Sequence, residues 1–80
     1  MNTNENLNEK SSQSQASRIL AYMQQGNRIT GIEALELFGC FRLPARIADI
    51  RDRGYEIKSE TITLRNGKRV KDYWMEIAQA

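Results

Sequence analysis

Apolar residues recur at helical spacing in three stretches, and the first of these begins near residue 12. Ser12, with Gln15 three residues later, has the form of a capping box, and Gly26 closes the stretch. Between these limits the apolar positions lie three and four residues apart, at Ala16, Ile19, Leu20 and Met23. The pattern therefore predicts a helix from Ser12 to the glycine, with its apolar stripe in the core.

A second capping box follows at Thr30 and Glu33, with Ile29 and Ala34 placed to form a hydrophobic staple. Gly39 marks the end of this second helix. The apolar residues between these limits cover a broad part of the helix surface: Ala34, Leu35, Leu37 and Phe38. Such coverage predicts a short helix buried between two neighbouring elements.

The third stretch, residues 43–53, has the pattern of a short helix with two different faces. Pro44 suits the first helical position, which leaves Leu43 in the extended conformation preferred before proline, and the following glycine suits a left-handed stop. Leu43, Ile47 and Ile50 are spaced by four and three, so they form one stripe that should face the core. The opposite face carries arginines beside small alanines, a composition that fits a DNA groove.

After residue 54 the hydrophobic period changes from helical to alternating, which indicates strands. The apolar residues of 55–57 and of 62–64 alternate in opposite phases. Because one slip in phase turns every side chain to the other face, the pattern predicts a bulge or break near residues 59–60.

An Asn-Gly pair at residues 66–67 is a strong signal for a hairpin turn. A three-residue loop over 66–68 places Leu64 opposite Val70, whereas a two-residue loop pairs Leu64 with Arg69. The three-residue loop is the preferred prediction, because it pairs two apolar side chains.

Three helices followed by a hairpin with a basic tip predict an α+β fold, a three-helix winged helix-turn-helix with a C-terminal β-hairpin wing. Residues 1–11 are rich in Asn, Glu, Ser and Thr, so we predict a disordered N-terminal tail there and one domain over 12–80. The predicted core joins at least one of Tyr73 and Trp74 to the helix stripes. Its helical members are Ile19, Leu20, Leu35, Phe38, Leu43, Ile47 and Ile50.

Composition excludes several kinds of site. The chain of 80 residues has no histidine and a single cysteine, Cys40, so neither an intrachain disulfide nor a Cys/His zinc site can form. A domain of this size has room only for a shallow cleft, and the sequence has no glycine-rich phosphate loop. We therefore expect no enzymatic activity, no metal and no cofactor. Neither a membrane span nor a secretory signal is visible, so we expect a cytoplasmic protein.

Basic charge is concentrated in the second half of the chain. The net charge is +2, but the stretch from Arg42 to Lys71 holds nine basic and four acidic residues, a net +5 that leaves −3 for the remainder. An anion-binding surface needs such an asymmetry. The candidate DNA-contacting residues lie on the third helix and at the hairpin tip: Arg42, Ala45, Arg46, Asp49, Arg53, Arg65, Lys68 and Arg69.

Some of these residues have competing roles. Arg46 lies on the flank of the apolar stripe, so its stem could cover apolar surface or its guanidinium could pair with a carboxylate. Asp49 is repelled by phosphate but can accept a hydrogen bond from cytosine N4, and its alternative role is to orient an arginine. The hairpin tip is expected to contact backbone phosphate or the adjacent minor groove rather than to read sequence.

The run ITGIEALELFGCFRLPARIADIRDRGYEI and the ending GKRVKDYWMEI resemble a small helix-turn-helix family of bacteriophages and bacterial mobile elements. The resemblance extends over about Ser14 to Ile77. It implies a double-stranded DNA partner and the role of a transcriptional regulator, or of an accessory factor in excision or recombination. The turn before the third helix is longer than in repressor-type proteins, so the contact residues above are taken from helix geometry.

Two classes of function therefore remain open at the level of sequence. The first is a DNA-binding protein, which the arginines of the third helix and the basic wing favour. The second is a winged helix that binds another protein without binding DNA, which Asp49 and Asp52 keep open. The first helix or the tail is a candidate for homodimer formation, although no heptad seam is visible.

Overall fold

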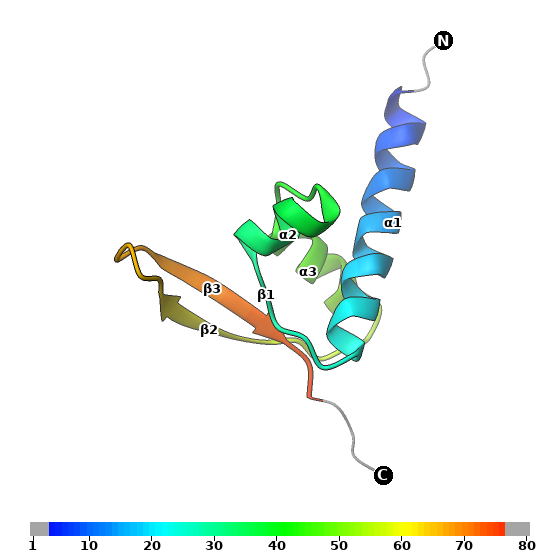
Figure 1. Ribbon diagram of the computed structural model, residues 1–80. Helices are drawn as coiled ribbons and strands as arrows, with labels where there is room; N and C mark the ends of the chain where they lie inside the picture. Colours follow the sequence, from blue (N-terminus) through cyan, green and yellow to red (C-terminus); the bar gives the residue numbers. More distant parts are fainter. Residues whose placement is uncertain (1–3, 77–80) are drawn as a thin grey trace.

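The computed structural model describes residues 4–76, with side chains from residue 13 onward. Its elements are α1 (Asn4–Gln24), β1 (Ile29–Thr30), α2 (Gly31–Phe38), α3 (Leu43–Asp52), β2 (Lys58–Thr63) and β3 (Arg69–Trp74). The β2–β3 hairpin projects to one side of the molecule, and α1 lies on the opposite side (Figure 1). Three helices followed by a hairpin confirm the predicted α+β winged helix-turn-helix fold.

α1 begins at Asn4 rather than at Ser12, so the predicted capping box at Ser12 does not start this helix. The prediction of a disordered tail over 1–11 is wrong for residues 4–11, which are helical, and residues 1–3 lie outside the described part. No proline or glycine occurs from Asn4 to Gln24, so no residue interrupts the helix as it extends toward the N-terminus. The domain boundary at residue 12 stays a prediction.

The core lies where α1, α3 and the sheet meet. The largest fully buried side chains are Ile19, Met23, Ile29, Leu43, Ile47, Ile50 and Cys40. The predicted apolar stripe of α3 is therefore confirmed, and Cys40 is a buried free thiol. Tyr73 is the buried aromatic residue of β3, whereas Trp74 is only partly buried.

α2 is less buried than its apolar coverage predicted. Ala34 is the buried residue of this helix, whereas Leu35 and Leu37 are 42% and 50% exposed. Phe38 is partly buried, with its ring edge-on to Tyr22 at a centroid distance of 5.5 Å. The prediction that Leu35 belongs to the core is wrong, because Leu35 lines an open groove instead of packing in the core.

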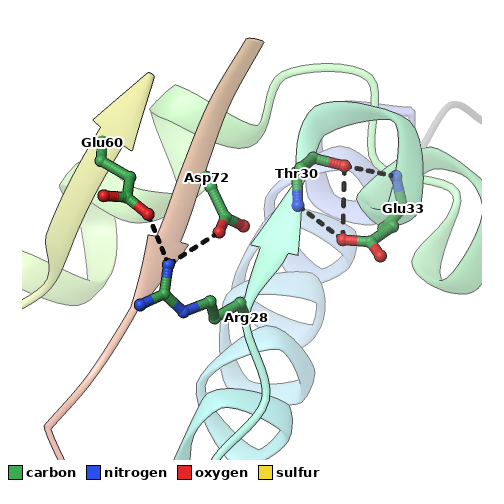
Figure 2. Close-up of polar contacts among 5 residues, drawn as sticks. All are labelled: Arg28, Thr30, Glu33, Glu60 and Asp72. Carbon is green, nitrogen blue, oxygen red and sulfur yellow. Dashed lines mark hydrogen bonds and ion pairs between the residues drawn. The ribbon is translucent and has the colours of Figure 1, made fainter. Parts of the chain in front are cut away.

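The ends of α2 follow from local sequence. Glu33 Oε1 accepts from the Thr30 N–H at 2.9 Å, and Thr30 Oγ1 accepts from the Glu33 N–H at 3.3 Å (Figure 2). This reciprocal pair confirms the predicted capping box. Ile29 and Ala34, the predicted staple, are both fully buried, and Gly39 ends the helix with φ +64°.

α3 also has the predicted limits to within one residue. The helix begins at Leu43, so Pro44 follows its first residue instead of forming it. At the other end Gly54 has φ +101°, and the N–H of Tyr55 donates to the carbonyl of Ile50 at 3.4 Å. This is the Schellman arrangement, in which a residue in the left-handed conformation allows the N–H groups after the helix to donate to its last carbonyls.

The β2–β3 hairpin has the predicted three-residue loop, but the loop starts one residue earlier. The N–H of Leu64 donates to the carbonyl of Lys68 at 2.7 Å, so the loop is 65–67. The predicted pairing of Leu64 with Val70 is therefore wrong. Gly67 has φ +87°, and a loop of this type needs its left-handed residue in the last position. The partner of Leu64 moves by two residues, so each side chain keeps its predicted face.

The ladder between β2 and β3 runs without interruption from Lys58 opposite Trp74 to Thr63 opposite Arg69. The bulge or break predicted near residues 59–60 is therefore wrong. The change of phase lies before β2, where the buried Ile57 belongs to the connection that follows α3 and not to the strand.

β1 is a strand that the hydrophobic pattern did not predict. Ile29 pairs with Tyr73 and Thr30 pairs with Asp72, so β3 is the central strand of a sheet with the order β1-β3-β2. Two residues are too few to produce an alternating signal. The consequence is that the hairpin is joined to the helices along one edge of β3.

Replacing Ile47 by Ala should lower the free energy of unfolding by about 2–5 kcal/mol, because truncation of a buried side chain leaves a cavity that neighbours fill only partly. Ile47 is 1% exposed. Urea denaturation followed by circular dichroism measures the change. The control is Leu37→Ala, a similar truncation of a half-exposed side chain, which should cost much less. Equal losses in the two variants would show that the α3 stripe does not face the core.

Candidate nucleic-acid interface

Arg42 lies at the N-terminal end of α3 as its N-cap residue. Its side chain is exposed and makes no capping hydrogen bond. The helix starts through the backbone, because the Arg42 carbonyl accepts from the N–H of Ala45 at 3.1 Å. The guanidinium thus projects from the end of the helix that contacts base edges in helix-turn-helix proteins. Ala45, the second candidate here, is half-buried.

Arg46 and Asp49 form an ion pair within α3. The Nε atom of Arg46 lies 3.2 Å from Asp49 Oδ2, and the Arg46 side chain is 17% exposed. The angle of this contact is not that of a hydrogen bond, so the buried Nε atom has no hydrogen-bond partner among the described residues. The competing role considered for Asp49, orientation of an arginine, is the arrangement seen here.

Two further arginines of this region contact other parts of the fold. Arg53 follows α3, and its guanidinium donates to the hydroxyl of Ser17 in α1 at 3.2 Å. Arg51 was not a candidate residue, and its guanidinium donates to the carbonyl of Ile57 at 2.7 Å. Arg51 therefore holds the connection between α3 and β2, and Arg53 ties the end of α3 to α1.

The three candidate residues at the hairpin tip differ from these arginines. Arg65, Lys68 and Arg69 are all exposed. Within residues 4–76, none of their side chains forms an ion pair with a carboxylate. Their charges are thus available to an external anion.

A groove lies between the start of α3 and the hairpin. Its volume is about 400 Å³, and its lining is mainly apolar. Lining side chains come from α2, from the turn before α3, from the start of α3 and from β3, and include Ile32, Leu35, Phe41, Pro44, Val70 and Lys71. Phe41 is 85% exposed. The start of α3 and the hairpin therefore border one concave surface, together with α2.

A protein-family model described as a winged helix-turn-helix domain matches residues 14–77. The chain belongs to this family. Neither a curated protein nor a solved structure matches the chain. Membership agrees with the order of helices and strands described above, and winged helix-turn-helix domains are in general DNA-binding modules without catalytic activity.

In this winged helix-turn-helix domain the base of the wing is held by a cluster that the sequence did not predict. Arg28 Nη1 donates to Glu60 Oε2 at 2.7 Å and to Asp72 Oδ2 at 3.1 Å (Figure 2). The guanidinium carbon lies 4.0 Å from the ring centroid of Trp74. Both hydrogen bonds raise the pKa of Arg28, because they stabilise its charged form, and the bond to Glu60 has the larger effect.

This cluster lies on the face of the sheet away from the helices, because Asp72 and Trp74 point opposite to the buried Tyr73. Glu60 and Asp72 lie 32 and 44 residues after Arg28 in the chain, so no local sequence pattern could have indicated this cluster. It joins the segment before β1 to both strands of the wing.

No helix within residues 4–76 combines the length and the apolar character needed to cross a membrane. In the same part of the chain, no group of three or more His, Cys, Asp or Glu side chains is arranged to hold a metal ion.

Replacing Arg28 by Met should lower the melting temperature, because the Asp72 carboxylate, with a side chain 10% exposed, then lacks a charged partner. Glu60→Gln should have a smaller effect, since Glu60 is half exposed and solvent screens its charge. Adding Asp72→Asn to Arg28→Met should recover part of the loss in a thermal melt. A double variant no more stable than Arg28→Met would contradict this account of the cluster.

Proposed function

We propose that this protein binds double-stranded DNA, with α3 in the major groove and the hairpin tip on the adjacent backbone. The observation that carries the proposal is that the N-terminal end of α3 and β3 of the wing line one groove, together with α2. Exposed cations adjoin the lining residues in the chain, with Arg42 next to Phe41 and the tip residue Arg69 next to Val70. A duplex that touches both elements meets base edges through α3 and phosphates through the wing.

The proposed contact residues are those predicted from the sequence: Arg42, Ala45, Arg46, Asp49, Arg53, Arg65, Lys68 and Arg69. Their proposed roles differ because their environments differ. Arg42 is proposed to reach a guanine edge or a phosphate, since its side chain is exposed. Arg46 is paired with Asp49 and Arg53 with Ser17, so a duplex would have to compete with these contacts.

The finer role that we propose is that of a regulator of transcription, or of an accessory factor in excision or recombination, as in bacteriophages and mobile elements. The support for this role is the resemblance of the sequence. The alternative function is binding to another protein, which the exposed apolar groove favours.

An NMR titration of the whole chain with a duplex of random sequence separates the two functions. DNA binding predicts amide shifts at the start of α3 and in the hairpin, with little change along α1. The absence of shifts at micromolar concentrations and low salt, or shifts confined to α1, would contradict the proposal.

Replacing Arg42 by Ala should weaken binding to a preferred duplex by about 1–3 kcal/mol if the guanidinium makes a bidentate base contact, with relaxed preference at that base pair. Fluorescence anisotropy with matched and mismatched duplexes measures both effects. The control is Arg18→Ala, because Arg18 lies on α1 with its guanidinium 5.4 Å from the Phe38 ring. Equal affinities of the Arg42 and Arg18 variants would remove Arg42 from the interface.

Replacing Arg65, Lys68 and Arg69 together by Ala should reduce the slope of log affinity against log salt by about 0.9 for each phosphate that these side chains neutralise. Because phosphate contacts carry no sequence information, specific and random duplexes should weaken alike. The control is Lys58→Ala, since Lys58 lies at the other end of β2 and is paired with Glu76 at 3.4 Å. An unchanged slope would show that the wing does not touch DNA, and a weakening restricted to the specific duplex would make it a reader of sequence.

A further inference from the structure

Phe41 is the most exposed of the large apolar side chains in the described part of the chain, at 85%. It lies in the turn before α3, between the buried Cys40 and the N-cap residue Arg42. The turn therefore directs a small apolar side chain inward and a large one outward. An aromatic side chain buries about 150–250 Å² when it is covered, so its exposure leaves a large apolar area for a partner.

The charges around Phe41 favour an anionic partner. Arg42 is its neighbour in the chain, and Lys71 is the charged residue that lines the same groove. A second copy of this chain seated on the groove would oppose like charges across the contact, which disfavours that arrangement. A duplex that touches α3 and the wing, by contrast, passes over the groove and presents negative charge to both cations.

The position of Phe41 restricts which part of a duplex it can meet. In helix-turn-helix proteins the N-terminal residues of the recognition helix contact base edges in the major groove, and Phe41 immediately precedes that end of α3. In the major groove an A·T base pair presents an apolar group, the 5-methyl group of thymine, which apolar side chains such as phenylalanine contact. Ile32 and Leu35 also line the groove, but they belong to α2 and not to the segment that leads into α3.

We propose that Phe41 recognises thymine by covering its 5-methyl group in the major groove. This inference rests on the proposed binding of DNA through α3 and adds a residue that determines sequence preference. Arg42 then supplies a polar contact and Phe41 an apolar contact to neighbouring base edges. The preferred site of the protein should contain at least one thymine whose methyl group contributes to affinity.

The experiment begins with selection of a preferred duplex from a random pool by the wild-type chain. Each thymine of that duplex is then replaced by uracil, which lacks only the methyl group, and the dissociation constants are measured. At one or two positions uracil should weaken wild-type binding about fourfold, the equivalent of the roughly 0.8 kcal/mol gained on burying one carbon group. Phe41→Ala should bind the unmodified duplex more weakly and show no further weakening at those positions.

Leu37→Ala is the matched control, because Leu37 is also exposed, at 50%, but does not line the groove. It should retain the wild-type response to uracil. Phe41→Ala removes an exposed side chain, so an unchanged melting temperature verifies that it folds.

The inference is overturned if the selected duplex lacks thymine, if uracil weakens wild type and Phe41→Ala equally, or if uracil has no effect on either. It is also overturned if Phe41→Ala binds DNA as wild type does, because Phe41 would then not contact DNA. Binding to a protein would remain as its alternative role. In those cases DNA binding itself still stands. Failure of the proposed function gives a different result, since the selection then enriches no duplex and wild type binds none.

Discussion

The packing of α3 on α1 is the contact on which the rest of this structure depends. Leu43, Ile47 and Ile50 are buried in one cluster with Ile19 and Met23. Since these three residues occupy one side of α3, their burial fixes the rotation of the helix about its axis. The rotation in turn directs Arg42 outward and holds the N-terminal end of α3 at the edge of the groove.

The wing depends on a second set of contacts, because a two-stranded hairpin is marginally stable by itself. β3 is the central strand, so it gains backbone pairing from β1 as well as from β2. On the face toward the helices Tyr73 joins the core, and on the other face Arg28 links Glu60 to Asp72. The hairpin tip points away from the helices (Figure 1), while the base of the hairpin is held from both faces.

The arginines of this chain divide into two groups that composition cannot separate. Arg28, Arg51 and Arg53 make hydrogen bonds within the fold, and Arg46 is paired with Asp49. Arg42, Lys71 and the tip residues are exposed cations that make no such contacts within residues 4–76, and they lie in or next to a mainly apolar groove. Arg18 on α1 is also exposed and makes neither kind of contact, but its guanidinium lies over the Phe38 ring. Counting basic residues in the sequence therefore gives more candidate contact residues than the structure leaves available. The same count does not reveal the apolar lining of the groove.

The sequence by itself determined the elements whose limits depend on neighbouring residues. The Thr30 and Glu33 capping box, Gly54 after α3 and the turn glycine Gly67 act within a few residues of the chain, so their patterns predicted α2, α3 and the hairpin. Only the tertiary structure decided which side chains are buried in the core and which form hydrogen bonds or ion pairs with distant residues. Leu35 is exposed because it lines an open groove, and Arg28 meets Asp72 across 44 residues. Such contacts depend on how distant segments are brought together, which local spacing does not record.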